Sequence, residues 1–277
     1  MRKETWLANV FHRYLRVPYT LNVKVYQNPK HPRATFVFIH GIGNSLHAWN
    51  EIVDTLPDDV RLIGIDLLGF GDSPKPRHAV YNAKTQARSV GVTLLSLRLA
   101  QRPILIGHSL GALVAVDIAS RSPLVIKRLV LCSPPFYRPR VPTANTLSKE
   151  EMLRSLYKAA LKHPEQLQKL SPIAVRLGLA NKALTINEDT TASYIAALES
   201  SIINQTSLSE IRRLTLPITI MYGALDPVVV GVNIARLGKS QKNITVKRVV
   251  AGHEVVGRYA KELTKLLSSL LSRTNGA

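Results

Sequence analysis

The sequence predicts an α/β fold built on a mostly parallel sheet, and three observations lead to that prediction. Short apolar runs rich in β-branched residues alternate with longer helical stretches along the 277-residue chain. These runs are almost entirely apolar, as strands are when helices cover both faces of a sheet. Glycine-rich or polar segments follow several runs directly, which is typical of loops at the carboxyl ends of parallel strands.

Six segments are expected to form parallel strands joined by right-handed helical crossovers. Ahead of them, residues 17–28 alternate enough to form an antiparallel entry strand or a hairpin, and residues 5–15 could form a short amphipathic helix. The predicted strands are 35–40, 60–66, 103–108, 128–133, 217–223 and 244–250, and the predicted helices are 46–56, 82–101, 109–121, 206–213, 232–239 and 255–272.

One region interrupts the alternation. Residues 134–205 contain no convincing strand, but they contain helical patches at 148–163 and 190–203 that are separated by prolines. We therefore expect a helical insertion between the fourth and fifth parallel strands, covering one end of the sheet. The rest of the sheet would be formed by residues 1–133 and 206–277.

Composition favours an ordinary water-soluble protein. Hydrophobic residues make up 45% and charged residues 20% of the chain, and no apolar run approaches the roughly 18 residues of a membrane span. Glu4, His12 and Arg13 interrupt any apolar signal sequence, and the single cysteine, Cys132, excludes an intramolecular disulfide. We expect a cytoplasmic location.

The chain carries a large positive charge. There are 37 Lys and Arg against 18 Asp and Glu, which gives a net charge of +19. The charge is spread along the chain without blocks of like charge, and no zinc-finger or RNA-recognition pattern accompanies it. We expect no specific nucleic-acid binding; the charge favours solubility in general, or a weak association with anionic membrane surfaces.

Ser109 is the candidate nucleophile. It lies in Gly107-His108-Ser109-Leu110-Gly111, where an apolar strand turns into an apolar helix. This G-x-S-x-G pattern is typical of a nucleophile elbow, a tight turn that exposes a serine in a strained backbone conformation. Bulky side chains at the two glycines would collide with neighbouring backbone.

Asp226 and His253 are the candidate acid and base. Each comes shortly after a predicted strand, and their separation of 27 positions leaves room for one helix and one strand. Both side chains can therefore reach the same edge of the sheet as Ser109. In the order Ser, Asp, His, they match the requirements of a catalytic triad.

The loop after the first parallel strand, His40-Gly41-Ile42-Gly43-Asn44-Ser45, can approach a substrate closely because of its glycines. The backbone N–H groups of Ile42 and Leu110 are expected to form an oxyanion hole. Apolar residues beside the motifs are expected to line an acyl pocket, namely Phe70, Phe136, Tyr137 and Val228, with Leu110 beside them.

Taken together, these motifs resemble the α/β-hydrolase superfamily over nearly the whole chain. The matching pieces are HGIGNS, the run from Asp66 to Ser73, GHSLG, YGALDP and AGHE. The resemblance implies Ser109 as nucleophile, His253 as base, Asp226 as orienting acid and residues 134–205 as a cap. It also implies that His40 braces its loop and that His108 fills the elbow. Serine at 109, where haloalkane dehalogenases and epoxide hydrolases carry aspartate, argues against those two activities.

The expected reaction is hydrolysis of small or medium acyl esters through an acyl-enzyme, as in a carboxylesterase, with no metal or organic cofactor. A carbon–carbon bond hydrolase of the meta-cleavage type and a cofactor-free perhydrolase remain alternatives, because the same three residues serve all three reactions. A non-catalytic ligand-binding member of the fold is the alternative from another class. Cys132, among apolar neighbours, is expected to be a buried structural thiol.

Overall fold

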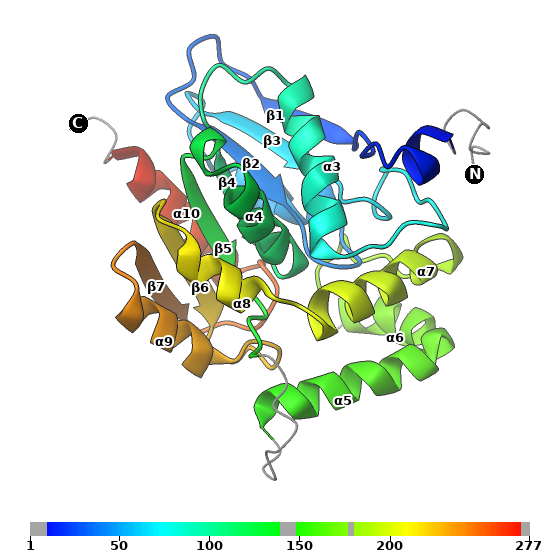
Figure 1. Ribbon diagram of the computed structural model, residues 1–277. Coiled ribbons are helices and arrows are strands. Elements are labelled where there is room, and N and C mark those ends of the chain that lie inside the picture. The colour runs from blue at the N-terminus through cyan, green and yellow to red at the C-terminus, as the bar shows by residue number, and fades with distance from the viewer. Residues whose placement is uncertain (1–9, 139–147, 177–179, 273–277) are drawn as a thin grey trace.

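A seven-stranded sheet forms the centre of the protein in the computed structural model, which describes residues 10–138, 148–176 and 180–272 (Figure 1). The strands run in the spatial order β1-β3-β2-β4-β5-β6-β7; β1 is antiparallel to β3 and every other pair is parallel. The strands are β1 (Val23–Gln27), β2 (Thr35–Ile39), β3 (Arg61–Ile65), β4 (Ile104–His108), β5 (Arg128–Cys132), β6 (Ile218–Gly223) and β7 (Ile244–Val249).

All six predicted parallel strands are confirmed. The central strands β2 and β4 are buried along their whole length, which explains why they contain no polar alternation. The entry segment forms the single antiparallel strand β1. Of the predicted amphipathic helix at 5–15, residues 5–9 lie outside the described residues, and Val10–Tyr14 form one π-helical turn, η1.

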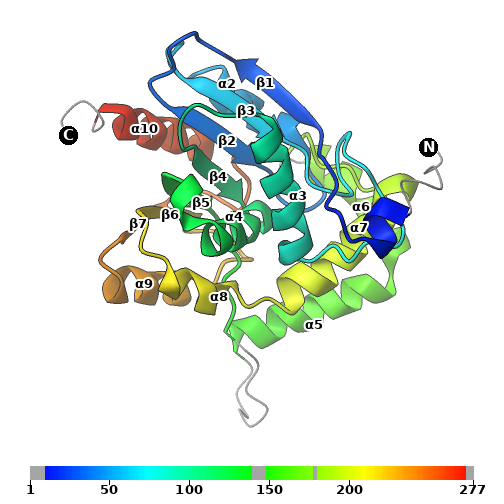
Figure 2. The same cartoon turned by 45° about the horizontal axis from the view of Figure 1, so that its top comes forward.

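Helices cover both faces of the sheet. Helices α3 (Ala83–Ser96), α4 (Leu110–Arg121), α8 (Ser207–Glu210) and α9 (Gly231–Ser240) lie on one face, and α2 (Asn50–Val53) and α10 (Arg258–Ser272) lie on the other (Figures 1 and 2). Each face therefore encloses its own apolar layer. Leu113 and Ile234 pack in one layer, and Phe38 and Leu263 pack in the other.

Several helix bounds differ from the expectation. The segment predicted as 46–56 divides into the 3-10 turn η2 (Leu46–Trp49) and α2, and the segment predicted as 206–213 divides into α8 and η5 (Ile211–Arg213). The helix predicted as 82–101 ends at Ser96, and Arg98 just after it has a φ of 45°. A further short turn, η3 (Pro123–Val125), follows α4.

The described part of residues 134–205 forms three helices and a π-helical turn. They are α5 (Lys149–Lys162), α6 (Pro164–Arg176), α7 (Glu188–Ala197) and η4 (Leu198–Ile203). Figures 1 and 2 both place α5, α6 and α7 beyond one end of the sheet. The segment is tied to loops of the sheet by hydrogen bonds from Thr185 N to the Gly43 carbonyl (2.8 Å) and from Ser201 Oγ to the Tyr81 carbonyl (2.9 Å).

Within the described ranges, no helix is both long enough and apolar enough to cross a bilayer.

Candidate active site

Ser109 occupies the turn between β4 and α4 with a strained backbone. Its φ of 50° and ψ of −114° lie in a region that residues with a side chain rarely adopt, and such a conformation costs on the order of 1–3 kcal/mol. Two hydrogen bonds hold the turn: Ser109 N donates to the Cys132 carbonyl (2.9 Å), and Ala112 N donates to the Ser109 carbonyl (3.0 Å).

The two glycines of the elbow are required by close backbone packing. A Cβ atom on Gly107 would lie 2.4 Å from the carbonyl oxygen of Gly111. A Cβ atom on Gly111 would lie 2.2 Å from the carbonyl oxygen of Ile39 in the adjacent strand. Backbone atoms at these positions cannot move aside, so any side chain here would displace the turn that carries Ser109.

Asp226 and His253 lie in contact, on the loops that follow β6 and β7. His253 Nδ1 donates to Asp226 Oδ2 at 2.8 Å, which leaves the lone pair of the imidazole on Nε2. The other carboxylate oxygen, Oδ1, accepts hydrogen bonds from the amides of Val228 (2.8 Å) and Val229 (3.1 Å). The carboxylate is therefore fixed on both sides, and it fixes the tautomer of the imidazole.

The electrostatics of this pair favour its charged form. Burial lowers the pKa of His253, but the hydrogen bond and negative charge of Asp226, together with the charge of Glu254, outweigh burial and raise the pKa above its ordinary value. Burial raises the pKa of Asp226, but the hydrogen bond and charge of His253 and the two backbone amides bring the pKa below its ordinary value. His253 is thus a stronger base than an isolated histidine.

Ser109 and His253 border one cavity of about 160 Å³ at the carboxyl ends of the strands. Across the described part of the chain, no hydrogen bond joins the Ser109 hydroxyl to His253; such bonds are often long before substrate binds. The cavity is lined by Gly41, Ile42, Asn44, His108, Ser109, Pro135, Tyr157, Leu184, Tyr194, Leu198, Ile202, Val228, His253 and Glu254.

The oxyanion donors predicted from the sequence are the backbone N–H groups of Ile42 and Leu110. Ile42 lines the cavity, and Leu110 begins α4 beside Ser109. In the described structure, neither backbone N–H donates to a protein acceptor. His40 braces the loop: its Nδ1 donates to the Gly41 carbonyl (2.7 Å), and its Nε2 accepts from the Leu67 amide (2.9 Å). Burial lowers the pKa of His40, so the ring is neutral.

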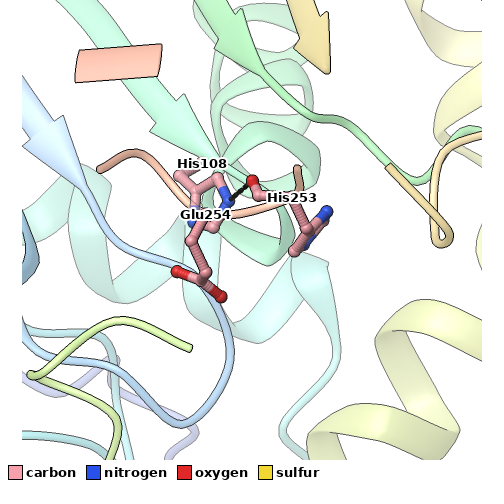
Figure 3. A group of neighbouring side chains, drawn as sticks. All are labelled: His108, His253 and Glu254. Carbon is pink, nitrogen blue, oxygen red and sulfur yellow. Dashed lines mark hydrogen bonds between the residues drawn. The ribbon is translucent and has the colours of Figure 1, made fainter. Parts of the chain in front are cut away.

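His108 holds the loop that carries the base. Its Nε2 donates to the backbone carbonyl of His253 at 3.0 Å (Figure 3). Burial, and then the charge of His253, lower the pKa of His108 to about 3. The ring is therefore neutral at physiological pH and donates its hydrogen bond to the loop that contains His253.

His108, His253 and Glu254 bring potential metal-ligand atoms within 4.8 Å of one another (Figure 3). Their donor atoms fit a metal poorly. Because a carbonyl oxygen only accepts hydrogen bonds, His108 Nε2 carries a proton and offers no lone pair. His253 Nδ1 is occupied by Asp226, so this residue offers only Nε2, the atom that a general base would use. Two remaining side chains are too few for a resident zinc ion.

Of the four residues predicted to line an acyl pocket, one borders the cavity and three do not. Val228 lines the cavity, whereas Phe70, Phe136 and Tyr137 are buried among core side chains and do not border it. The physical reason is their position in tight turns, which direct the rings into the apolar layers. Tyr137 instead donates from its hydroxyl to the Val228 carbonyl (2.9 Å) and so positions the wall of the cavity.

Sequence reasoning missed most of the apolar wall. Tyr157, Leu184, Tyr194, Leu198 and Ile202 come from the helical insertion, and no motif marks them. It also missed Asn44 and Glu254, although both stand inside the quoted motifs HGIGNS and AGHE. Cys132 is fully buried, and burial raises the pKa of its thiol to about 12, in keeping with a structural thiol.

A family model for the alpha/beta hydrolase fold matches residues 34–256. The match covers most of the chain, and the chain therefore belongs to the alpha/beta hydrolase fold family.

The chain is also similar to individual curated proteins and to solved structures. The chain is 35% identical over 108 residues to a probable lysophospholipase, BODYGUARD 4 of Arabidopsis thaliana, and the match covers 38% of this chain and 26% of that protein. This chain therefore spans about a quarter of the length of that relative. An esterase from Thermogutta terrifontis superposes with a TM-score of 0.71 at 17% identity, covering 91% of this chain and 93% of that chain. A bromoperoxidase from Bacillus anthracis superposes with a TM-score of 0.72 at 19% identity, covering 91% and 95%.

These likenesses support the fold rather than one reaction. The two solved structures have almost the same TM-score, although one is an esterase and the other a bromoperoxidase. The reaction must therefore be argued from the site.

Proposed function

We propose that this chain hydrolyses carboxylic esters through an acyl-enzyme on Ser109. The observation that carries the proposal is the Asp226–His253 hydrogen bond of 2.8 Å beside a cavity that also contains the strained Ser109. A neutral His253 accepts the serine proton at Nε2 as Oγ attacks the ester carbonyl. Asp226 then stabilises the imidazolium, and the imidazolium protonates the leaving alcohol. Water, activated by His253, releases the acid in the second step.

The amides of Ile42 and Leu110 would bind the oxyanion that forms during both steps. Their N–H groups have no protein acceptor within the described ranges. A single donor of this kind lowers the barrier by about 3–4 kcal/mol. No cofactor or metal takes part in this mechanism.

Residues 134–205 act as the cap in this proposal. Their side chains at Tyr157, Leu184, Tyr194, Leu198 and Ile202 supply much of the apolar wall of the cavity. A cavity of about 160 Å³ is smaller than the roughly 300–1,000 Å³ of typical small-molecule sites, which favours short acyl chains. The buried cysteine supports a reducing, cytoplasmic location.

Lysophospholipid hydrolysis is a second candidate, favoured by the curated relative that carries that name. A long acyl chain exceeds the present cavity, so this candidate requires movement of the cap helices. Carbon–carbon bond hydrolysis and perhydrolysis remain alternatives because they use the same three side chains.

The test combines a substrate series with one variant. p-Nitrophenyl esters of increasing chain length should be hydrolysed fastest at short chains, and a meta-cleavage diketone and a peracid assay should give little activity. Ser109→Ala should lose at least about 10³-fold in kcat, as triad serines do, and should no longer react with a fluorophosphonate probe. Full esterase activity in the Ala variant would exclude the mechanism, and binding without turnover by the unaltered chain would favour the non-catalytic alternative.

A further inference from the structure

Two polar side chains border the cavity without complete hydrogen bonding. Asn44 lies in the loop after β2 and is only 3% exposed, and Glu254 directly follows His253. The Asn44 side chain lies close to the Glu254 carboxyl group and acts to lower the pKa of that group. Asn44 Oδ1 and Glu254 Oε2 are nevertheless shielded from solvent and have no hydrogen-bond partner in the described ranges.

Both unpaired atoms are acceptors. An unsatisfied buried acceptor typically costs 1–3 kcal/mol, and a charged one costs more, so two of them on side chains that line one cavity require an explanation. The described residues place no lysine or arginine in an ion pair with Glu254, although the chain has 37 basic residues. Burial raises the pKa of Glu254, against the opposing effects of His253 and Asn44. The pair therefore presents acceptors without a protein donor.

The position of Asn44 and Glu254 indicates that they would contact the alcohol part of an ester substrate. Glu254 is the neighbour of His253, the residue that would protonate the leaving alcohol, and Asn44 is two residues from Ile42. The alcohol part of an ester must lie against His253 when it departs. Hydrogen-bond donors on that alcohol, close to the ester oxygen, would lie in the part of the cavity that Asn44 and Glu254 line.

A neutral donor suits this chain better than a cationic one. The net charge of +19 repels a cationic substrate as it approaches. A hydroxyl group carries no such penalty, and two adjacent hydroxyl groups could satisfy both acceptors at once. Water is the alternative partner, but a water molecule gives no preference among substrates.

We infer that Asn44 and Glu254 form a subsite for hydroxyl groups on the alcohol part of the substrate, so that the preferred esters are acyl esters of a polyol such as glycerol. The inference rests on the proposed ester hydrolysis and specifies its substrate class. The same acylglycerol unit occurs in monoacylglycerols and in lysophospholipids. The Glu254 carboxyl group would disfavour a phosphate held close to it.

The experiment compares two substrates of the same shape. Glyceryl monobutyrate carries two free hydroxyl groups, and propyl butyrate carries none. The measured quantity is the ratio of their kcat/KM values within one enzyme, because a change in the pKa of His253 affects both substrates alike and cancels. For the unaltered chain we expect a ratio of about ten or more, which corresponds to one hydrogen bond to a buried polar group.

The variants are Glu254→Leu and Asn44→Ala, with the exposed Glu188→Leu in α7 as the matched control. The ratio should fall about tenfold in Glu254→Leu and fall in the same direction in Asn44→Ala, whereas Glu188→Leu should keep the original ratio. If one variant fails to fold, as judged by its melting curve, the other still tests the subsite.

Several results would overturn the subsite. They are a ratio near one in the unaltered chain, an unchanged ratio in the folded variants, and a preference for butyrylcholine over glyceryl monobutyrate. These results leave the proposed function intact, since ester hydrolysis continues; loss of both activities in the unaltered chain would refute the proposed function instead. The hydrolysis rates of a monoacylglycerol and a lysophospholipid with equal acyl chains then show which of the two supplies the acylglycerol unit. Faster hydrolysis of either one than of the matching ester without hydroxyl groups supports the subsite.

Discussion

Replacing Asp226 by asparagine tests the geometry of the acid and base directly. The side chain keeps its shape, but one oxygen becomes an NH₂ group. Asp226 Oδ1 accepts from the amides of Val228 and Val229 at 2.8 and 3.1 Å. The oxygen of the new amide must occupy that position, since turning the NH₂ group toward two N–H donors would lose two hydrogen bonds and leave the amides unpaired.

The NH₂ group consequently faces His253 Nδ1. A donor in this position makes Nδ1 the acceptor and moves the ring proton to Nε2, the atom that must accept the serine proton. The wrong tautomer lowers kcat on the order of 10⁴-fold in a serine triad, which corresponds to about 5 kcal/mol of barrier.

A pH series supplies a second readout. In the unaltered chain the pKa of His253 is raised by Asp226 and Glu254 in spite of burial. Activity therefore falls as the pH drops through a value above the ordinary 6.5, where His253 becomes protonated and ceases to be a base. In Asp226→Asn the negative charge is absent, so the acid limb should move to lower pH while the plateau falls.

The assay is kcat and kcat/KM for p-nitrophenyl butyrate across the pH range, with exposed Asp189→Asn in α7 as the matched control. An Asp226→Asn variant that is folded and retains more than a tenth of the original kcat would refute this reasoning. An acid limb that stays in place would refute the electrostatic part.

The remaining predictions concern the elbow and the charge. Gly111→Ala should destabilise the fold by several kcal/mol, because the new Cβ would lie 2.2 Å from a backbone oxygen. Gly91→Ala in α3 is the control; its Cβ would meet no described atom outside its own helix within 4 Å, so it should stabilise the fold by up to about 1 kcal/mol. Equal melting temperatures for the two variants would contradict the clash. Binding to anionic vesicles should be measurable at low salt and should fade at about 0.5 M salt, because Tyr14 and Leu15 are 71% and 62% exposed in a chain of net charge +19. Binding that is absent at low salt would eliminate the membrane association.

The sheet could be predicted from sequence because its strands obey a local rule. Strands such as Phe36–Ile39 are buried on both faces, so every residue in them is apolar, and the pattern is visible without tertiary information. The motif residues Ser109, Asp226 and His253 were located in the same way, since they follow strands directly. Their catalytic roles stay proposals.

The lining of the cavity could not be predicted, because it depends on packing between distant segments. Phe70 and Phe136 flank motifs in sequence, but their turns direct both rings into the core. Leu184 and Tyr194 stand far from any motif, but they pack against Gly43, and the amide of neighbouring Thr185 donates to the Gly43 carbonyl. The importance of Asn44 and Glu254 emerges only from their missing partners, which no sequence pattern reveals.

Asp226 and His253 follow the last two strands at one edge of the sheet, β6 and β7, while Ser109 follows the central strand β4. Leu225 N donates to the Ala251 carbonyl at 3.0 Å, so the two loops are held to each other. Fraying of this edge would separate His253 from Ser109 while the middle of the sheet stays intact. Heat inactivation should therefore precede the loss of helical signal, and mutations that fasten β7 would prolong activity without touching a catalytic group.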